Sequence, residues 1–229
     1  MEDWLDGLAT RRADVGRSST AERVAEILRE HITEGRLLPG TRLSEEDIGA
    51  ALRVSRNTLR EAFRLLTHER LLVHEFNRGV FVRTLSADDV RDLYRFRRLL
   101  ESAAVRAAVD ATPAELAAVR ESVEEGERAA AAGDWYAVGT ANMHFHQALA
   151  GLSRSPRFED TMRQVLAELR LVFHVMADPW AFHEPYLQRN RELSDLLAEG
   201  RVAAAEETLS HYFDVAEKQL LDAMTPVRT

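Results

Sequence analysis

The sequence of 229 residues is 45% hydrophobic and 30% charged, a composition typical of globular proteins rather than of disordered or low-complexity chains. No apolar run reaches the roughly 18 residues that span a bilayer, the acidic start does not resemble a signal peptide, and the lack of cysteine excludes disulfides and thiolate sites. The net charge is −8, but residues 1–84 hold 14 basic and 14 acidic residues, whereas residues 85–229 hold 16 and 24. We therefore expect a cytoplasmic protein with no membrane partner, built from two domains that have different partners.

In the N-terminal part of the chain, the pattern of apolar and capping residues predicts three helices followed by a β-hairpin. Apolar residues recur at helical spacing up to Gly35, and Ser44 and Ser55 are placed to cap the next two helices. Two short apolar runs then flank a turn, which is the pattern of a hairpin. Three helices and a hairpin make a winged helix-turn-helix. The expected elements are helices from residue 19 or 20 to 35, over 45–52 and from 55, then strands over 71–74 and 79–82, within a domain of residues 19–84 that follows a tail, 1–18.

Beyond residue 85 the pattern is helical, and no further strand is expected. Proline, glycine and capping residues divide this part into six helical stretches. The predicted fold class is therefore mostly α, with an N-terminal winged helix-turn-helix followed by an all-α six-helix bundle. The helices are expected roughly over 87–110, 113–132, 134–152, 156–177, 184–199 and 201–223, within a domain of residues 85–224 that a tail, 225–229, follows.

The third helix carries a stripe of arginines that is typical of a DNA recognition helix. Arg56, Arg60 and Arg64 recur every four residues opposite the apolar face, and short polar side chains occupy the start of the helix. Arginine suits both guanine edges and phosphates. A solvated basic face would explain three arginines alone, but the helix-turn-helix frame and the basic hairpin tip favour DNA binding. The candidate DNA-binding residues are Arg42, Ser44, Ser55, Arg56, Asn57, Thr58, Arg60, Arg64, Arg78 and Gly79.

Three stretches of this part share a pattern: LPGTRLSEE at 38–46, VSRNTLREA at 54–62 and NRGVFV at 77–82. Together they resemble the GntR family of bacterial transcription regulators. In that family the arginines matching Arg56 and Arg60 meet operator DNA, and the wing glycine matching Gly79 approaches the minor groove. Arg53 and Arg70 depart from the pattern, because the family usually has glycine at both positions.

The helical part carries RRLLE at 97–101, NMHFH at 142–146, Asn190 ten residues before Gly200, and LSHYF at 209–213. In these stretches it resembles the FCD domain of the FadR branch, in its six-helix, VanR-like form, which implies that residues 85–224 are an effector-binding and dimerisation domain. In metal-containing members an Asp and a His one turn apart, with two further His, hold a divalent cation to which a small carboxylate effector can bind. By register those positions hold Asn142, His146, Asn190 and Tyr212 here. Because the carboxylate and two imidazoles are replaced, tight binding of Zn²⁺ or Ni²⁺ is not expected. Were a metal present, its ligands would be Asn142, His146 and, with the register shifted by one, His211.

Helical spacing also directs polar side chains inward. Arg97 lies on an otherwise apolar helix face, and an unpaired buried guanidinium is costly, so an anion must compensate it. That anion is either Glu101, one turn further on, or the carboxylate of a ligand. His144, His174 and His183 lack a partner at ligand spacing and are interpreted as surface or interface residues. We expect no cofactor, and a small organic acid bound beside Arg97, Asn142, His146, Asn190 and Tyr212.

Three functions can be compared on these residues. The first hypothesis is a transcription regulator that binds a palindromic operator as a homodimer and is modulated by a small-molecule effector, which changes the spacing of two DNA-reading heads. The alternative is a metal-dependent regulator with a divalent cation in the helical bundle, which stoichiometric metal in the purified protein would identify. A small α-helical hydrolase would need a nucleophile–base pair or paired carboxylates. The sequence shows neither, so we do not expect an enzyme.

Overall fold

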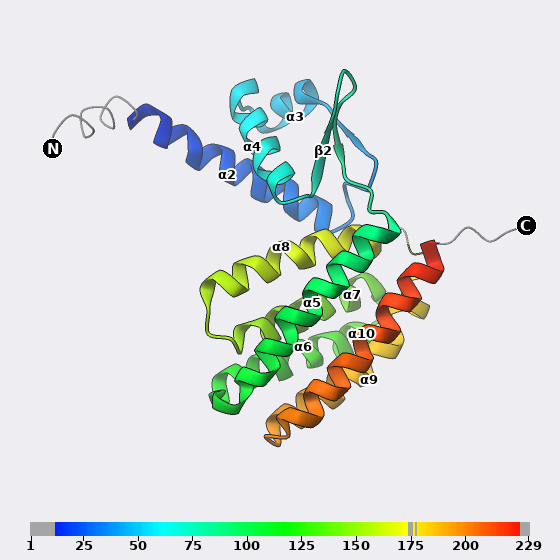
Figure 1. The fold of residues 1–229 in the computed structure, drawn as a ribbon. Helices are drawn as coiled ribbons and strands as arrows, with labels where there is room; N and C mark the ends of the chain where they lie inside the picture. The colour runs from blue at the N-terminus through cyan, green and yellow to red at the C-terminus, as the bar shows by residue number, and fades with distance from the viewer. Residues whose placement is uncertain (1–11, 174–175, 177, 225–229) are drawn as a thin grey trace, which may run out of the picture. The chain divides into compact units, whose positions relative to one another are not determined.

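The computed structural model describes residues 12–173, 176 and 178–224, and the chain divides into two compact units, Met1–Thr84 and Leu85–Thr229 (Figure 1). The first unit combines three helices with a small sheet, and the second is helical, which confirms the predicted fold class. The elements of the first unit are α2 (Arg12–Thr33), β1 (Arg42–Leu43), α3 (Glu45–Leu52), α4 (Arg56–His68), β2 (Leu72–Glu75) and β3 (Gly79–Val82).

Helix α2 begins at Arg12, well before the expected start at residue 19 or 20. Residues 12–18, which were expected to be tail, are therefore helix. Their arginine and alanine residues favour helix, and no proline interrupts them, so the helix extends past the serine and threonine that were expected to cap it. Residues 1–11 of the expected N-terminal tail and the whole of the expected C-terminal tail, 225–229, lie outside the described residues, as does His174.

The sheet has three antiparallel strands in the order β1-β3-β2. Strands β2 and β3 form the predicted hairpin, with His74 opposite Val80, and β1 adds to the other side of β3, with Arg42 opposite Phe81. The sequence did not predict β1, because two residues are too few for an alternating pattern to show. The hairpin is the wing of the winged helix-turn-helix, and β1 pairs along the outer edge of β3.

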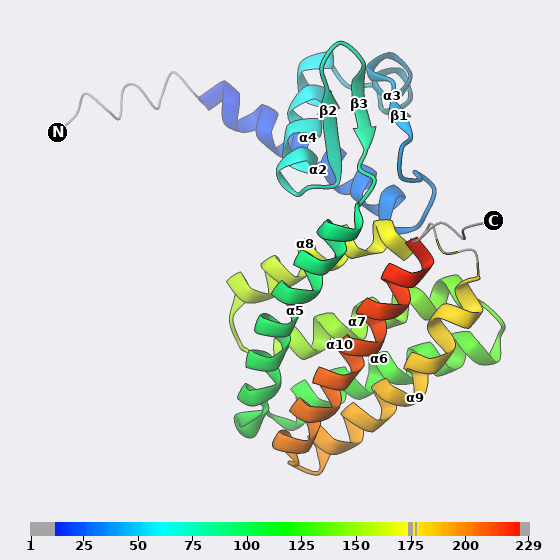
Figure 2. The same cartoon turned by 45° about the vertical axis from the view of Figure 1, so that its right-hand side comes forward.

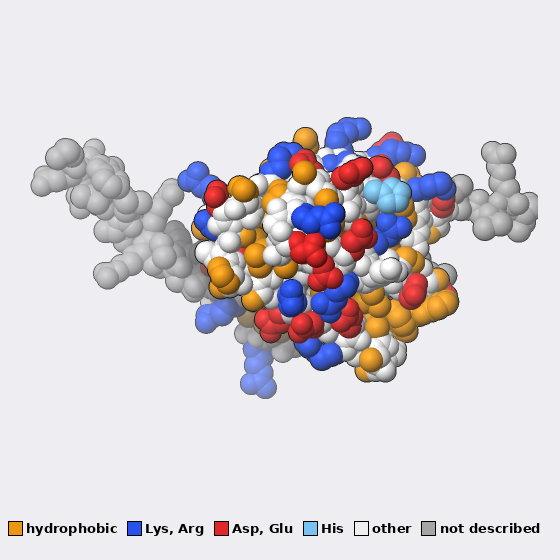
Figure 3. Space-filling view, turned by 90° about the horizontal axis from the view of Figure 1, so that it is seen from below, with side chains coloured by type: hydrophobic (Ala, Val, Ile, Leu, Met, Phe, Trp, Pro, Cys, Tyr) orange, Lys and Arg blue, Asp and Glu red, His pale blue; other side chains and the backbone are white. Residues whose placement is uncertain are grey.

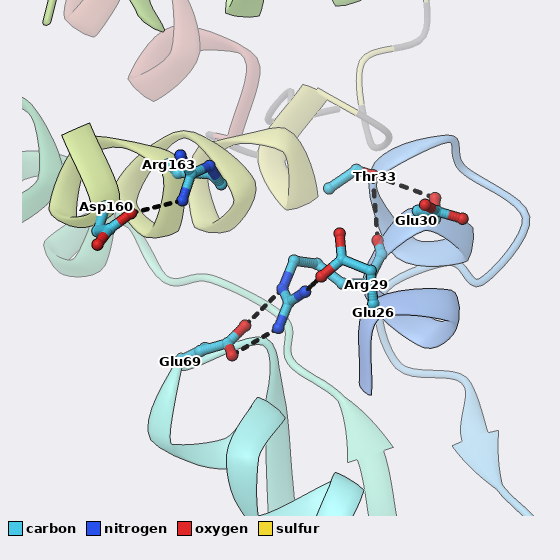
Figure 4. Close-up of polar contacts among 7 residues, drawn as sticks. All are labelled: Glu26, Arg29, Glu30, Thr33, Glu69, Asp160 and Arg163. Carbon is cyan, nitrogen blue, oxygen red and sulfur yellow. Dashed lines mark hydrogen bonds and ion pairs between the residues drawn. The ribbon is translucent and has the colours of Figure 1, made fainter. Parts of the chain in front are cut away.

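An ion pair joins α2 to the end of α4 (Figure 4). Arg29 Nε and Nη2 donate to the two carboxylate oxygens of Glu69 at 2.7 and 2.6 Å, and Arg29 also pairs with Glu26. The side chains of Arg29 and Glu69 are only 20% and 14% exposed, so this bidentate pair is worth more than a fully exposed one. Together with the buried face of α4, it holds the recognition helix on α2. That buried face consists of Leu59, Ala62, Phe63 and Leu66.

The second unit is a bundle of six α-helices over the described residues (Figure 2). Capping boxes start its first two helices, at Ser86 and at Thr112. Helix α5 packs beside α10, and α6 packs against both α7 and α9. No helix in the described part of the chain is long and apolar enough to cross a membrane. The elements are α5 (Ala87–Ala107), the 3-10 helix η1 (Ala108–Asp110), α6 (Pro113–Ala131), α7 (Trp135–Gly151), α8 (Pro156–Phe173), α9 (Pro179–Ala198) and α10 (Val202–Met224).

Helix α9 begins five residues before its expected start at 184. Asp178 caps it by accepting a hydrogen bond from Ala181 N at 3.1 Å, and Pro179 takes the first helical position, where its missing N–H costs nothing. Pro185 lies inside the helix and cannot donate to the carbonyl of Ala181. Gln219 Nε2 donates to that carbonyl instead, at 3.3 Å. A partner on α10 therefore compensates for the interior proline, and no sequence pattern could have shown this.

Charged side chains of both signs are interspersed on the face of the molecule shown in Figure 3. Ion pairs also join helices of the second unit. Arg191 Nη2 lies 2.5 Å from Glu127 Oε2, and Arg106 pairs with Glu206. These pairs are partly exposed, so each contributes little to stability.

Candidate functional site

Serine caps fix the two helices of the helix-turn-helix. Ser44 Oγ accepts a hydrogen bond from Asp47 N at 3.2 Å at the start of α3. At the start of α4, Ser55 Oγ accepts from Thr58 N at 3.1 Å and lies 2.8 Å from the Thr58 hydroxyl. Three of the candidate DNA-binding residues therefore also have a local structural role, which is to set where each helix begins.

The remaining candidates of α4 lie on its exposed face. Arg56 and Asn57 are exposed in the first turn, and Arg60 and Arg64 follow on later turns. Arg60 Nε donates to both carboxylate oxygens of Glu45, at 3.0 and 3.1 Å. The arginine stripe that the sequence predicted is thus present on the surface, and one of its members is held by the preceding helix of the motif.

The wing carries a second basic group close to its tip. Arg42 Nε donates to the carbonyl of Arg78 at 3.0 Å, and the Arg78 guanidinium lies 5.5 Å from the centre of the Phe81 ring. Gly79 has φ +112°, and a Cβ on it would lie 3.3 Å from Arg42 Nε, so a side chain at this position would be both strained and crowded. Arg42, Arg78 and Gly79 therefore form one cluster on β1 and the hairpin.

Arg53 and Arg70, which replace the family's usual glycines, both adopt left-handed backbone. Their φ angles are 53° and 59°. Arg53 is the C-cap of α3, so it occupies the turn between the two helices of the motif. A left-handed conformation costs a residue with a Cβ roughly 1–2 kcal/mol, so these arginines keep the backbone geometry of glycine at some cost in stability.

A buried polar network lies in the core of the second unit. Arg97 Nε donates to Glu101 Oε1 at 2.8 Å, and His146 Nδ1 donates to Glu101 Oε2 at 2.6 Å. The three side chains are at most 1% exposed. The Arg97 guanidinium also lies 4.9 Å from the centre of the Phe213 ring. Of the two anions considered for Arg97, Glu101 is therefore the one that compensates it in this structure.

The network continues from His146 to α10, α7 and α9. His146 Nε2 lies 3.1 Å from the Tyr212 hydroxyl oxygen, which in turn lies 3.1 Å from Asn142 Oδ1. Asn190 Nδ2 donates to the same Asn142 oxygen at 2.7 Å. All five residues that were expected to bind an effector are thus connected. Glu101, which the sequence indicated only as the partner of Arg97, joins them as a sixth member.

Burial and the neighbouring side chains together determine the protonation of this network. It lowers the pKa of His146 below its ordinary value, although Glu101 opposes the effect, so His146 is neutral. Burial alone would raise the pKa of Glu101, but Arg97 and His146 outweigh it, and the pKa is lowered. The single ring proton of His146 is on Nδ1, facing the carboxylate, so Nε2 is an acceptor. The Tyr212 hydroxyl proton therefore has two acceptors within reach, His146 Nε2 and Asn142 Oδ1.

These residues do not fit a divalent transition metal. Both ring nitrogens of His146 are engaged, and the charge of Glu101 is balanced by Arg97. His211 is exposed, whereas its neighbour Tyr212 is buried, so the alternative set of Asn142, His146 and His211 is not brought together. Over the described residues, no group of three or more His, Asp or Glu side chains could hold a metal ion.

A small cavity lies beside the two asparagines, between α6, α7 and α9. Its volume is about 10 Å³, which is room for roughly one water molecule. Two buried polar atoms, His183 Nδ1 and Asn190 Oδ1, have no hydrogen-bond partner among the described residues. Arg97, His146 and Tyr212 do not line the cavity. Its polar lining consists of Asn142, Asn190 and three residues that sequence reasoning missed, Ser122, His183 and Tyr186.

The expectation that His183 is a surface residue is wrong, because its side chain is only 4% exposed. The early start of α9 brings it onto the same helix face as Tyr186 and Asn190. Burial, together with Arg170, lowers the pKa of His183 to about 3, so it is neutral. His144, by contrast, is exposed, and its Nδ1 lies 2.8 Å from a Glu125 carboxylate oxygen.

Comparisons with known proteins agree with this two-part architecture. Residues 20–82 match the family described as bacterial regulatory proteins, gntR family, and residues 92–215 match the FCD domain. Over 198 residues the chain is 31% identical to the Nta operon transcriptional regulator of Aminobacter aminovorans, covering 83% of this chain and 91% of that protein.

Two solved structures share the fold. One is described as a transcriptional regulator GntR from Rhodococcus sp. RHA1; it is 50% identical, with a TM-score of 0.84 over 90% of this chain and 99% of that chain. The other is E. coli McbR/YncC, which is 22% identical, with a TM-score of 0.78 over 90% of this chain and 99% of that chain. The Aminobacter and Rhodococcus proteins are described as regulators of transcription, not as enzymes.

Proposed function

The chain belongs to the GntR family of bacterial regulatory proteins with an FCD domain, and from this premise we propose that an organic acid bound in its helical unit modulates how it binds operator DNA as a homodimer. It is a DNA-binding transcriptional regulator and not an enzyme. The observation that carries the DNA-binding part is the exposed arginine stripe of α4 beside a basic wing. Because bacterial operators lie in the cytoplasm, we propose that the protein acts there.

The first turn of α4 supplies the proposed base contacts. Arg56 and Asn57 are exposed where a recognition helix enters the major groove, and Arg60 lies one turn further on. Arg64 is suited to a phosphate, and the wing cluster around Gly79 to the minor groove or the backbone. A homodimer would read two half-sites, which multiplies specificity. Two large apolar side chains exposed on α5, Phe96 (40%) and Leu99 (67%), support a dimer contact through the helical unit.

We expect Arg56→Ala and Arg60→Ala each to weaken specific binding by about 5- to 150-fold, because a bidentate contact to guanine discriminates by roughly 1–3 kcal/mol. The probe is a duplex that the wild-type protein selects from a random library, and the selected site should be an inverted repeat. Fluorescence anisotropy at several salt concentrations gives the affinity and its salt dependence. Arg128→Ala, at an exposed arginine of α6, is the matched control and should bind like wild type. Wild-type affinity in both α4 variants would contradict the assignment of the recognition helix.

The helical unit offers an organic acid two places to bind, the guanidinium of Arg97 and the neutral polar groups that line the small cavity. Arg97 Nη2 and His183 Nδ1 are buried without hydrogen-bond partners in the described part of the chain. The charge of Arg97 is already balanced by Glu101, so a ligand carboxylate has to compete with that side chain or bind at the asparagines. An organic acid is larger than the cavity, so we propose that its binding widens the space between α6 and α9. Helix α5, which carries Arg97, directly follows the DNA-binding unit in the chain.

We expect a small carboxylic acid to raise the melting temperature of chelator-treated protein, because a ligand that binds only the folded state stabilises it by about 2.7 kcal/mol at 100 times its Kd. A thermal-shift screen of two- to six-carbon acids, followed by calorimetry, makes the measurement. Asn190→Leu and Ser122→Val should each weaken the effect, whereas Asn57→Leu, in the other unit, should leave it unchanged. Stabilisation that appears only after Zn²⁺ or Ni²⁺ is added would favour the metal-dependent alternative.

A further inference from the structure

Arg60 is held by a glutamate that belongs to a different helix. Its Nε donates to both Oε1 and Oε2 of Glu45, at 3.0 and 3.1 Å. Glu45 is the first residue of α3, and its side chain is 32% exposed, whereas that of Arg60 is 64% exposed. The contact therefore spans the two helices of the helix-turn-helix, and both side chains line the groove between α4 and the wing.

The way in which Arg60 is paired with an acidic side chain differs from that of Arg64 and Arg78. Arg64 uses its terminal Nη1 to pair with Glu61 at 2.9 Å, and Arg78 uses Nη1 to pair with Glu75. Those pairs occupy a nitrogen that a base or phosphate would need. Arg60 is engaged through Nε alone over the described residues, so four terminal N–H donors stay available. Two of them are enough for the O6 and N7 acceptors of guanine.

We propose that Glu45 is a positioning residue, which grips the Nε edge of Arg60 so that the two Nη groups are presented to a guanine in the major groove. This inference rests on the proposed role of Arg60 in reading DNA. An arginine side chain that is mobile in the free protein loses conformational entropy when DNA fixes it. Because Glu45 already restricts the side chain of Arg60, less entropy is lost on binding. The carboxylate also repels phosphates, so Glu45 disfavours DNA that does not offer the guanine.

The test compares Glu45→Ala with Glu46→Ala in the full-length protein. Both glutamates lie in the first turn of α3 and interact with its helix dipole, but only Glu45 pairs with Arg60. The probes are the duplex selected by the wild-type protein, its single-base-pair variants and an unrelated duplex of equal length. Each variant removes one negative charge, so both should bind the unrelated duplex more tightly, by about twofold or more. Only Glu45→Ala should lower the ratio of specific to non-specific affinity, by about tenfold.

Glu45→Ala should lose discrimination at one base pair of the selected duplex. We expect this to be the same G·C pair at which Arg60→Ala no longer discriminates. The double variant should discriminate no worse than Arg60→Ala, and Glu45→Gln, which keeps one acceptor oxygen, should recover part of the discrimination. If Glu45→Ala and Glu45→Gln both discriminate as well as Glu46→Ala, the positioning role is wrong. If Arg60→Ala itself leaves every base preference unchanged, the proposed contact between Arg60 and DNA is wrong, and the role of Glu45 falls with it.

Discussion

Replacing Glu101 with glutamine is expected to lower the free energy of unfolding of the helical unit by about 3–5 kcal/mol, the usual cost of removing one partner from a buried ion pair. Arg97 and Glu101 are 1% and 0% exposed, so the guanidinium would keep its charge without a counter-ion and without water. His146 would also lose its charged acceptor at 2.6 Å. Urea unfolding followed by circular dichroism measures the change.

Two further variants show whether burial causes the effect. Glu206→Gln breaks the pair with Arg106. The side chains of Arg106 and Glu206 are 57% and 35% exposed, so this variant should lower the free energy of unfolding by less than about 1 kcal/mol. The double variant Arg97→Met, Glu101→Leu replaces both charges by apolar groups and should recover much of the lost stability. A Glu101→Gln protein that is as stable as Glu206→Gln would show that the network contributes little to the folded state.

Gly139→Ala and Gly151→Ala are expected to change stability in opposite directions, although both add one methyl group to α7. A Cβ on Gly139 would overlap Arg170 Nη1 and lie 2.7 Å from His183 Nε2, and both of those side chains are buried. Overpacking of this kind typically costs about 1–3 kcal/mol. A Cβ on Gly151 would meet nothing within 4 Å, so alanine there should be neutral or should stabilise by up to about 1 kcal/mol.

The same urea experiment measures both glycine variants. Gly139→Ala should in addition weaken the response to any acid that the thermal-shift screen identifies, because His183 lines the cavity and would be displaced. Equal stability of the two variants would mean that Arg170 and His183 can move aside at no cost. In that case the contact at Gly139 would not be a constraint on the bundle.

Local signals were enough to predict most of the first unit from the sequence. Capping serines and two short apolar runs around a turn are read over a few neighbouring residues, and the hairpin lies close to where they indicated. The two-residue strand β1 carries no such period, because its place depends on pairing with Phe81 of β3. The hold of Glu45 on Arg60 joins residues 15 apart on two helices, so no local pattern could show it.

In the second unit, helical spacing correctly indicated which polar side chains face inward, including Arg97 and His146. The i, i+4 spacing also identified Glu101 as a partner of Arg97. Spacing could not show that the cavity lies on the far side of the asparagines, because that depends on how α6 and α9 pack. His183 was misplaced for a related reason: the helix was expected to begin only at residue 184, which left His183 outside it, and Gln219, which compensates for Pro185 inside the longer helix, is on another helix.

The single proton of the Tyr212 hydroxyl has a consequence for how the core responds to change. The hydroxyl can donate a well-aligned hydrogen bond to His146 Nε2 or to Asn142 Oδ1, but not to both at once. Strengthening one of these hydrogen bonds therefore weakens the other. Substitutions at these three positions will therefore not have additive free energies, and a double-mutant cycle between His146 and Asn142 should show coupling although the two side chains share no hydrogen bond. Thermodynamically, side chains from α5, α7, α9 and α10 behave as one cooperative unit.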